Sequence, residues 1–174
     1  MPELIDPTVR LRPSFLAAVA EFHADREQGV PWFVTNVDPP ALTDADAFAA
    51  YVARVLGERT EDGAVRNGFV PMTTLWWVEG EEMLGRLAIR HRLTPALERV
   101  GGHIGYDVRP GARRRGHATA MLAAALPVAR GLGITRALLT CDEANTASRR
   151  VIEANGGEFL DTDGDKRRYW VPTA

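Results

Sequence analysis

Cysteine, lysine and long apolar runs are nearly absent from this sequence of 174 residues. Its one cysteine, Cys141, has no partner within the chain, which excludes a disulfide framework and predicts a reducing, cytoplasmic compartment. The best apolar run, residues 120–129, is far shorter than the roughly 18 residues of a membrane span. The N-terminus lacks the basic and apolar regions of a signal peptide. We therefore expect no membrane association.

Internal repeats, low-complexity tracts and linkers are missing as well. The chain has 45% hydrophobic and 25% charged residues, close to the average of globular proteins. A chain of this length buries roughly 70% of the surface that its unfolded form exposes, so neither a metal nor a disulfide is needed to stabilise it. These properties predict a single domain over residues 1–174.

The net charge is small but unevenly distributed. The chain has 21 basic and 23 acidic residues, a balance of −2 that argues against general adhesion to nucleic acid or membranes. Residues 1–100 carry ten basic and fifteen acidic groups, whereas residues 101–174 carry eleven and eight. Only Lys166 is a lysine, and the planar fork of arginine suits phosphate recognition. We expect an anionic ligand on the C-terminal part.

Hydrophobic periodicity and turn residues predict the elements. The expected helices lie around residues 15–22, 43–57, 117–130 and 146–155. The expected strands lie at residues 72–78, 83–92, 102–109, 134–141 and 166–171, with a loop at residues 28–42. The alternation of strand and helix in the C-terminal part predicts parallel pairing. Ligands of such sheets bind at the carboxyl ends of the strands.

A basic turn between an expected strand and an expected helix carries the strongest chemical signal. Residues 113–118 read Arg-Arg-Arg-Gly-His-Ala. The first N–H groups of a helix lack partners within the helix and the dipole there is positive, so a pyrophosphate can bind them. The arginines add charge-assisted hydrogen bonds. Taken alone, the same pattern is also compatible with a solvated basic turn.

Other phosphate, metal and nucleophile sites fit the sequence poorly. Gly111 and Gly116 have the spacing of a P-loop, but His117 and Ala118 replace its Lys and Ser/Thr. No G-x-G-x-x-G follows a strand, and the four histidines lack the spacing of a zinc site. Acidic neighbours of Cys141 oppose thiolate formation.

A second feature begins 29 residues after Gly116. Asn145, Thr146, Ala147 and Ser148 open the helix after the strand at residues 134–141, and two glycines end it. Asn145 is a favourable N-cap residue, and it could equally contact a ligand. One asparagine can do both.

The ordered set of these features resembles the GNAT superfamily of acyl-CoA N-acyltransferases. The strand at residues 103–110, the R-x-x-G-x-A turn with its helix, and Asn145 with Ser148 carry the resemblance, which spans about residues 70–174. It resembles in particular a branch of predicted acetyltransferases of largely unassigned substrate. The resemblance implies a single α/β domain. Its central sheet would be mixed and mostly antiparallel, with a splayed parallel strand pair, flanked by helices.

The resemblance also implies acetyl-CoA as co-substrate, without a metal, bound between the strands at residues 102–109 and 134–141. The backbone of Val108 would face the pantetheine and thioester, and the main-chain amides of the turn would hold the pyrophosphate. Asn145 matches the asparagine that contacts pantetheine. The residues implied in cofactor binding are Val108, Arg113, Arg114, Arg115, Gly116, His117, Ala118, Thr119, Asn145 and Ser148.

The expected chemistry is direct attack of a neutral amine on the thioester, with a base and a donor for the departing thiolate. Many GNAT enzymes donate from a tyrosine seven residues after the asparagine, where this chain has Ile152. That leaves Ser148 or a water as the donor. His103 is the candidate base because histidine titrates near neutrality, and a hydrogen-bonded structural histidine is the alternative. Asp107, about 13 Å along a straight strand from His103, is an independent, weaker candidate.

The predicted function is therefore an acetyl-CoA-dependent N-acetyltransferase that acts on a primary amine of a small molecule or a peptide. Acidic residues of the N-terminal part, including Asp44, Asp46, Glu81 and Glu82, favour a cationic acceptor. The alternatives are a non-catalytic acyl-CoA-binding or regulatory module and, with less support, a nucleic-acid-binding module. The sequence leaves open a monomer or a homodimer.

Overall fold

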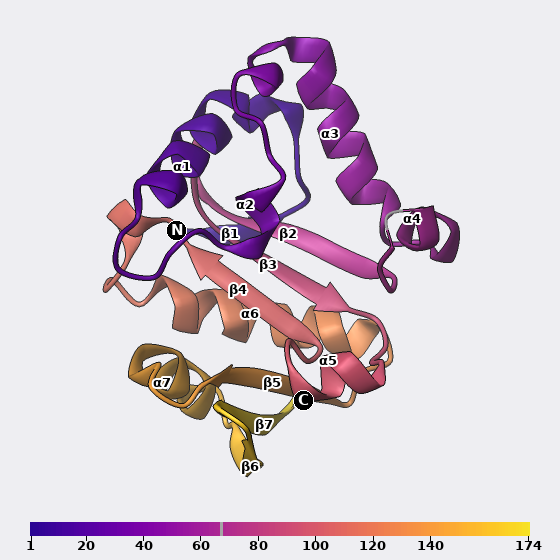
Figure 1. The fold of residues 1–174 in the computed structure, drawn as a ribbon, viewed down its shortest axis with the longest axis vertical. Coiled ribbons are helices and arrows are strands. Elements are labelled where there is room, and N and C mark those ends of the chain that lie inside the picture. Colours follow the sequence, from indigo (N-terminus) through magenta and orange to yellow (C-terminus); the bar gives the residue numbers. More distant parts are fainter. Residues whose placement is uncertain (67) are drawn as a thin grey trace.

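The computed structural model describes residues 1–66 and 68–174 and contains two antiparallel sheets (Figure 1). The strands of the first sheet, in spatial order, are β1 (Glu3–Ile5), β2 (Met72–Glu79), β3 (Glu82–Arg90) and β4 (Ile104–Val108). Those of the second are β5 (Arg136–Asp142), β7 (Lys166–Pro172) and β6 (Glu158–Asp163). The expected hairpin of β2 and β3 is confirmed.

Helices cover both faces of the first sheet. The longer ones are α1 (Arg12–Ala24), α3 (Ala45–Gly57), α6 (His117–Gly131) and α7 (Thr146–Ala154). The shorter ones are α2 (Trp32–Thr35), α4 (Glu61–Arg66) and α5 (Pro95–Arg99), with 3₁₀ turns η1 (Val9–Leu11), η2 (Ala41–Thr43) and η3 (Pro110–Ala112). Helices α1 and α3 pack on one face, while α6 contacts β1, β3 and β4 from the other. None of the described helices combines the length and the apolar character of a membrane crossing.

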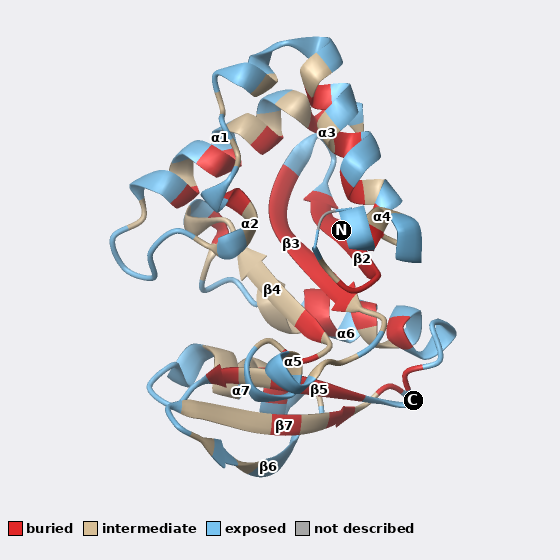
Figure 2. Cartoon of the chain, turned by 45° about the vertical axis from the view of Figure 1, so that its right-hand side comes forward, coloured by how far each residue is buried: buried red, intermediate tan, exposed pale blue. Residues whose placement is uncertain are grey.

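Two hydrophobic clusters stabilise these layers, and β2 contributes to both. Successive strand residues point to opposite faces, so Trp76 packs with Phe15 of α1 and Phe48 of α3, whereas Trp77 joins the cluster around α6. Because both faces are covered, β2 and β3 are buried along almost their whole length (Figure 2). A sheet buried on both faces explains the continuous apolar runs of the sequence.

The four expected longer helices are confirmed, and their caps explain their boundaries. Helix α3 begins after Asp44, whose carboxylate accepts a hydrogen bond from the Ala47 N–H at 2.8 Å. Helix α6 begins after Gly116, which has a positive φ of 80° that glycine adopts without strain. Asn145 caps α7, which confirms one of the two roles expected for this residue.

Several short elements were not expected from the sequence. Helices α2, α4 and α5 have only four to six residues, too few for a periodic apolar pattern. Helix α2 and η2 lie inside the segment expected to be a loop. Strand β6 was missed because it is an edge strand with little burial, so its sequence shows no continuous apolar run.

The expected parallel strand pair is not confirmed. Every strand pairing among the described residues is antiparallel, and β5 pairs with β7 rather than with β4. The two sheets meet where the His103 N–H donates to the Leu138 carbonyl at 2.7 Å. Beyond this point β4 and β5 separate (Figures 1 and 2). Strand β5 is paired with β7 along its whole length, and no ladder among the described residues joins it to β4.

Close backbone approach at this junction requires glycine. Gly102 has a φ of 60°, and a Cβ there would overlap the Leu138 carbonyl oxygen. The neighbouring Gly101 N–H donates to the Thr140 hydroxyl at 2.8 Å, and the Leu138 N–H donates to His103 Nδ1 at 2.8 Å. Residues 101–103 therefore join the two sheets through both backbone and side-chain hydrogen bonds.

We expect Gly102→Ala to lower the free energy of unfolding by about 2 kcal/mol or more, because it adds backbone strain and a clash at the junction. Gly105→Ala is the matched control on the same chain segment, since the nearest heavy atom to its Cβ would be 3.9 Å away. Urea denaturation of both variants measures the difference. Equal stability losses would show that close approach at residue 102 is unimportant.

Candidate active site

A cleft of about 550 Å³ opens where β4, the turn before α6, and α7 come together. Val108 lies at its strand side, Gly116 at the helix start and Ser148 at the opposite wall. Its lining comprises Glu27, Gln28, Tyr106, Asp107, Val108, Ala112, Arg113, Arg114, Gly116, His117, Ala118, Thr119, Asn145, Ala147, Ser148 and Val151. Of the residues expected to bind the cofactor, all but Arg115 line this one cleft.

The start of α6 presents backbone N–H groups to the cleft. His117, Ala118 and Thr119 form its first turn and line the cavity. These N–H groups precede the first hydrogen bonds within the helix, so the helix supplies a positive, donor-rich end. Arg114, with a φ of 64°, and Gly116 turn the preceding loop sharply. This geometry suits an anionic group such as a pyrophosphate.

Of the three arginines in the turn, Arg113 is engaged within the protein. Its Nη1 lies 2.8 Å from Asp25 Oδ2, and its Nε donates to the Val108 carbonyl at 3.2 Å. This hydrogen bond from the guanidinium holds the pKa of Asp25 below its usual value. Arg113 thus braces the turn. We expected all three arginine side chains to form hydrogen bonds with phosphate. The Arg114 side chain is 84% exposed and lies 3.4 Å from Glu27. Arg115 is not among the residues that line the cleft.

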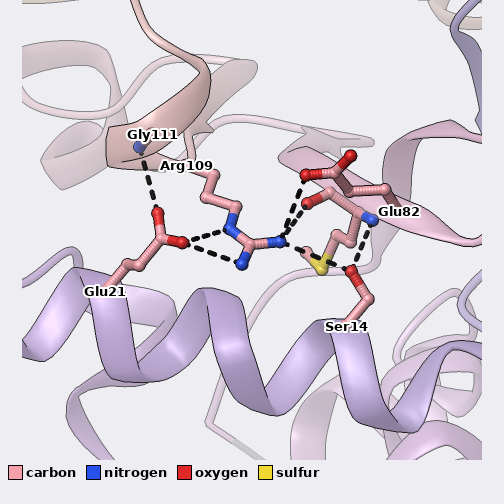
Figure 3. A network of polar contacts seen from close by, with 6 residues as sticks. Ser14, Glu21, Glu82, Arg109 and Gly111 are labelled. Carbon is pink, nitrogen blue, oxygen red and sulfur yellow. Dashed lines mark hydrogen bonds and ion pairs between the residues drawn. The ribbon is translucent and has the colours of Figure 1, made fainter.

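A carboxylate of α1 fixes the start of the same turn (Figure 3). Glu21 Oε1 accepts from Arg109 Nε at 2.8 Å, and its Oε2 accepts from the Gly111 N–H at 3.0 Å. The Arg109 guanidinium also reaches the Met83 carbonyl at 3.4 Å, and Ser14 accepts from the Met83 N–H. One polar network therefore holds together helix α1, the start of β3 and the turn that precedes α6.

A pair of hydroxyl groups lies on the wall formed by β4 and α7. Tyr106 Oη and Ser148 Oγ are 2.8 Å apart. Burial raises the pKa of Tyr106 to about 12, so its phenol stays protonated. Asn145 Oδ1 accepts from the Ser148 N–H at 3.1 Å, which fixes the first turn of α7. Burial also raises the pKa of the nearby Cys141 thiol, which disfavours a thiolate.

His103 lies at the sheet junction and is not among the described residues of the cleft. Its Nδ1 accepts from the Leu138 N–H. Burial and, to a lesser extent, the positive charge of Arg90 lower the pKa of His103. The side chain therefore serves as a neutral hydrogen-bond acceptor between the strands, and its expected role as the base has no support from this geometry.

Asp107, the weaker candidate of the sequence, does line the cleft. Burial raises the pKa of its carboxyl group, against the opposing effects of Arg86 and Arg113. Arg86 Nη1 lies 3.9 Å from Asp107 Oδ2. A carboxylate with a raised pKa facing a cleft is suited to accept a proton.

His117 has a partner that the sequence does not reveal. Its Nδ1 accepts from the indole N–H of Trp77 at 3.2 Å, from 40 residues earlier in the chain. This bond assigns the remaining proton of a neutral His117 ring to Nε2. Tyr106 was likewise missed, because only the folded chain brings β4 beside α7.

Comparison with known proteins identifies the family. The family model of the acetyltransferase (GNAT) domain matches residues 9–158. The chain belongs to the GNAT family. No curated protein matches it by sequence.

Solved structures of GNAT acetyltransferases share the fold. RimJ of Mycobacterium smegmatis, in complex with a CoA disulfide, has a TM-score of 0.63 at 21% identity over 97% of this chain and 79% of that one. The microcin C7 self-immunity acetyltransferase MccE, in complex with acetyl-CoA and AMP, has a TM-score of 0.66 at 11% identity. The match covers 98% of this chain and 92% of the MccE chain. RimL, a ribosomal L7/L12 α-N-protein acetyltransferase in complex with CoA, has a TM-score of 0.60 at 18% identity. The match covers 98% of this chain and 93% of the RimL chain.

The structure also places Ile152 and the acidic residues that suggested a cationic acceptor. Ile152 is fully buried in the cluster around α6 and is not part of the cleft lining, which agrees with the absence of a donor at this position in the sequence. Three of the four acidic residues that suggested a cationic acceptor contact groups of the protein itself: Asp44 caps α3, Glu81 pairs with Arg10, and Glu82 lies 3.7 Å from Arg109. The described residues contain no cluster of ligands for a metal ion.

The network of Figure 3 predicts a specific loss of stability. We expect Glu21→Ala to lower the free energy of unfolding by about 1.5 kcal/mol, because it removes charge-assisted bonds and leaves Arg109 largely buried without them. Glu27→Ala, whose ion pair with Arg114 is exposed, should cost less than about 0.5 kcal/mol. Chemical denaturation of both variants measures this order, and the reverse order would contradict the role of α1 as an anchor.

Proposed function

We propose that this GNAT protein is an acetyl-CoA-dependent N-acetyltransferase that moves an acetyl group to a primary amine. The observation that carries the proposal is the single cleft in which the α6 N-terminus, Asn145 and Ser148 meet. The donor-rich helix end suits the pyrophosphate of CoA, and the wall of Val108, Asn145 and Ser148 suits the pantetheine and thioester. CoA-bound structures of the same fold support this assignment.

In this proposal backbone groups hold most of the cofactor. The amides of His117, Ala118 and Thr119 bind the pyrophosphate, and the exposed Arg114, 3.4 Å from Glu27, lies beside it. Arg113 holds the loop in shape through Asp25 and Val108. The Val108 N–H and the Asn145 amide then align the pantetheine arm along the strand.

The chemical step is a direct transfer within a ternary complex. The amine nitrogen forms a bond with the thioester carbonyl carbon, and the carbon–sulfur bond breaks. One proton leaves the amine for a base, and the CoA thiolate takes a proton from Ser148 Oγ. Ser148 is suited to this because the protonated Tyr106 hydroxyl, 2.8 Å away, can donate to it and stabilise the negative charge that develops.

We assign the base to Asp107 in place of His103. Asp107 lines the cleft and its pKa is raised by burial, whereas the acceptor nitrogen of His103 is bonded to the backbone of β5. A raised pKa makes the carboxylate a better proton acceptor than an exposed aspartate.

Release of free thiol from acetyl-CoA across a panel of primary amines tests the function as a whole. We expect thiol release that depends on the amine, together with a mass increase of the amine by one acetyl group. Binding of CoA without turnover on any amine would instead identify a non-catalytic acyl-CoA-binding module.

For the donor, we expect Ser148→Ala to lower kcat by about a hundredfold, because the thiolate would leave without a positioned proton. Thr146→Ala is the matched control, since Thr146 begins the same helix but lies outside the described lining. Steady-state thiol release measures both. Equal rates for the two variants would remove Ser148 from the mechanism.

For the base, we expect Asp107→Asn to lower kcat/KM by about a hundredfold and to abolish the acid limb of its pH profile. Because burial raises the pKa of Asp107, this limb should lie at a higher pH than for an exposed aspartate. His103→Asn retains an acceptor for the Leu138 N–H and should change kcat/KM less than about threefold. A larger loss of kcat/KM in His103→Asn than in Asp107→Asn would identify His103 as the base.

A further inference from the structure

A buried tryptophan lies beneath the first turn of α6. Trp77 is 4% exposed and belongs to the hydrophobic cluster around this helix. Its indole N–H can only donate, and its partner is His117 Nδ1 at 3.2 Å. Because a buried indole N–H needs a partner, this bond stabilises the packing of α6 on the sheet. The same bond also fixes the ring of a residue that lines the cleft.

The packing of α6 explains why the two side chains meet. Gly85 of β3 is the register partner of both Trp77 and Val108, so the three residues lie in one row on the same face. A Cβ at Gly85 would lie only 3.4 Å from the buried Met121 side chain of α6. His117 is four residues before Met121 and therefore lies on the same side of the helix. The absence of a side chain at Gly85 lets α6 approach the sheet closely enough for His117 to contact Trp77.

The hydrogen bond to Trp77 determines what the other edge of the His117 ring presents. A ring nitrogen that accepts a hydrogen bond carries no proton, so the proton of the ring is on Nε2. The two nitrogens face away from each other across the ring. With Nδ1 directed at the core, Nε2 is directed away from it. His117 is half-buried and lines the cleft, and its ring forms no other hydrogen bond with the described residues.

The groups beside this N–H favour an anion with several oxygens. The backbone N–H groups of residues 117–119 open α6 in the same cleft and lack partners within the helix. Arg113 and Arg114 also line the cleft, but each is paired with a carboxylate of the protein. The donors that remain are therefore neutral N–H groups. An imidazole with its proton fixed on Nε2 adds one directional donor to this set without adding a charge.

We propose that the Trp77 indole holds the His117 ring in the orientation in which its Nε2–H donates to the pyrophosphate of bound CoA. Trp77 is then a positioning residue, and His117 binds the cofactor through its side chain as well as its backbone. This inference rests on the proposed function, in which the first turn of α6 binds the pyrophosphate. The alternative is a His117 that serves only as the partner of the buried indole.

Two substitutions of His117 separate the two edges of the ring. Asparagine places an oxygen close to the position of Nδ1, so His117→Asn keeps an acceptor for Trp77 and loses the donor on the cleft side. Glutamine reaches as far as Nε2, so His117→Gln keeps that donor and loses the acceptor. We expect His117→Asn to raise the Kd for CoA about tenfold with little change in melting temperature, because a hydrogen bond to a charged group is lost.

His117→Gln should show the opposite pattern, with a lower melting temperature and a Kd for CoA raised less than about threefold. Isothermal titration calorimetry measures both Kd values, and differential scanning calorimetry measures the stabilities. An unchanged Kd in His117→Asn, or a larger loss of affinity in His117→Gln than in His117→Asn, would overturn the inference, since only the bond to the indole would then matter.

A double-mutant cycle tests the positioning role of Trp77. Trp77→Phe removes the N–H and keeps an aromatic ring in the core, so the His117 ring can rotate or carry its proton on Nδ1. We expect Trp77→Phe to raise the Kd for CoA about threefold or more, with no further loss in a chain that already carries His117→Asn. Equal losses in the two backgrounds would overturn the role of Trp77.

Trp76→Phe is the matched control for this cycle. Trp76 is also buried, but it packs in the cluster around α1 and α3 on the opposite face of β2. The substitution should leave the Kd for CoA unchanged. If Trp77→Phe does not fold, as circular dichroism would show, His117→Asn decides the outcome, because it keeps a partner for the indole.

A truncated acyl donor separates this inference from the proposed function. S-acetylpantetheine has the thioester but no pyrophosphate, so His117→Asn should lower the ratio of kcat/KM for acetyl-CoA to that for S-acetylpantetheine about tenfold. If no amine is acetylated but the CoA affinities follow the expected pattern, the catalytic proposal fails and the inference stands. If amines are acetylated and His117→Asn leaves the ratio and the Kd unchanged, the function stands and the inference fails. If CoA does not bind, both fail.

Discussion

The hydrogen bond from the His103 N–H to the Leu138 carbonyl is the contact on which the rest of the site depends. It joins the two sheets at the beginning of β4. Strand β5 is paired with β7 along its whole length, and no ladder among the described residues joins β4 to β5, so the two strands separate beyond this contact. The cleft lies on the separated part, with Tyr106, Asp107 and Val108 on one side and α7 on the other. A continuous ladder between β4 and β5 would close this space.

The second constraint is electrostatic and comes from α1. Glu21 of α1 and Asp25, which directly follows the helix, hold Arg109 and Arg113, which flank η3. A loop of successive basic residues would otherwise repel itself, and its backbone would not be fixed. With these side chains engaged, the amides of the α6 N-terminus become the main donors for an anion. In the proposed function, arginine side chains therefore shape the site and backbone amides bind the anion.

The third element is the row of Trp76, Arg86 and Asp107 across the first sheet. It places the buried guanidinium of Arg86 3.9 Å from the Asp107 carboxylate, which faces the cleft. Burial and the neighbouring arginines act in opposite directions on the pKa of Asp107, and burial has the larger effect.

The sequence by itself determined the elements with strong periodicity, the basic turn before α6 and the position of Asn145 and Ser148, because these depend on local patterns and on the order of the motif. It did not determine β6, the short helices or the division into two antiparallel sheets, since edge strands and very short elements leave little hydrophobic signal. Only the tertiary structure decided which side chains face the cleft. It paired Arg113 with Asp25, directed His103 to the β5 backbone, and brought Tyr106 to Ser148 and Arg86 to Asp107. These outcomes depend on which strands and helices pack side by side, and such long-range contacts are not encoded in the spacing of neighbouring residues.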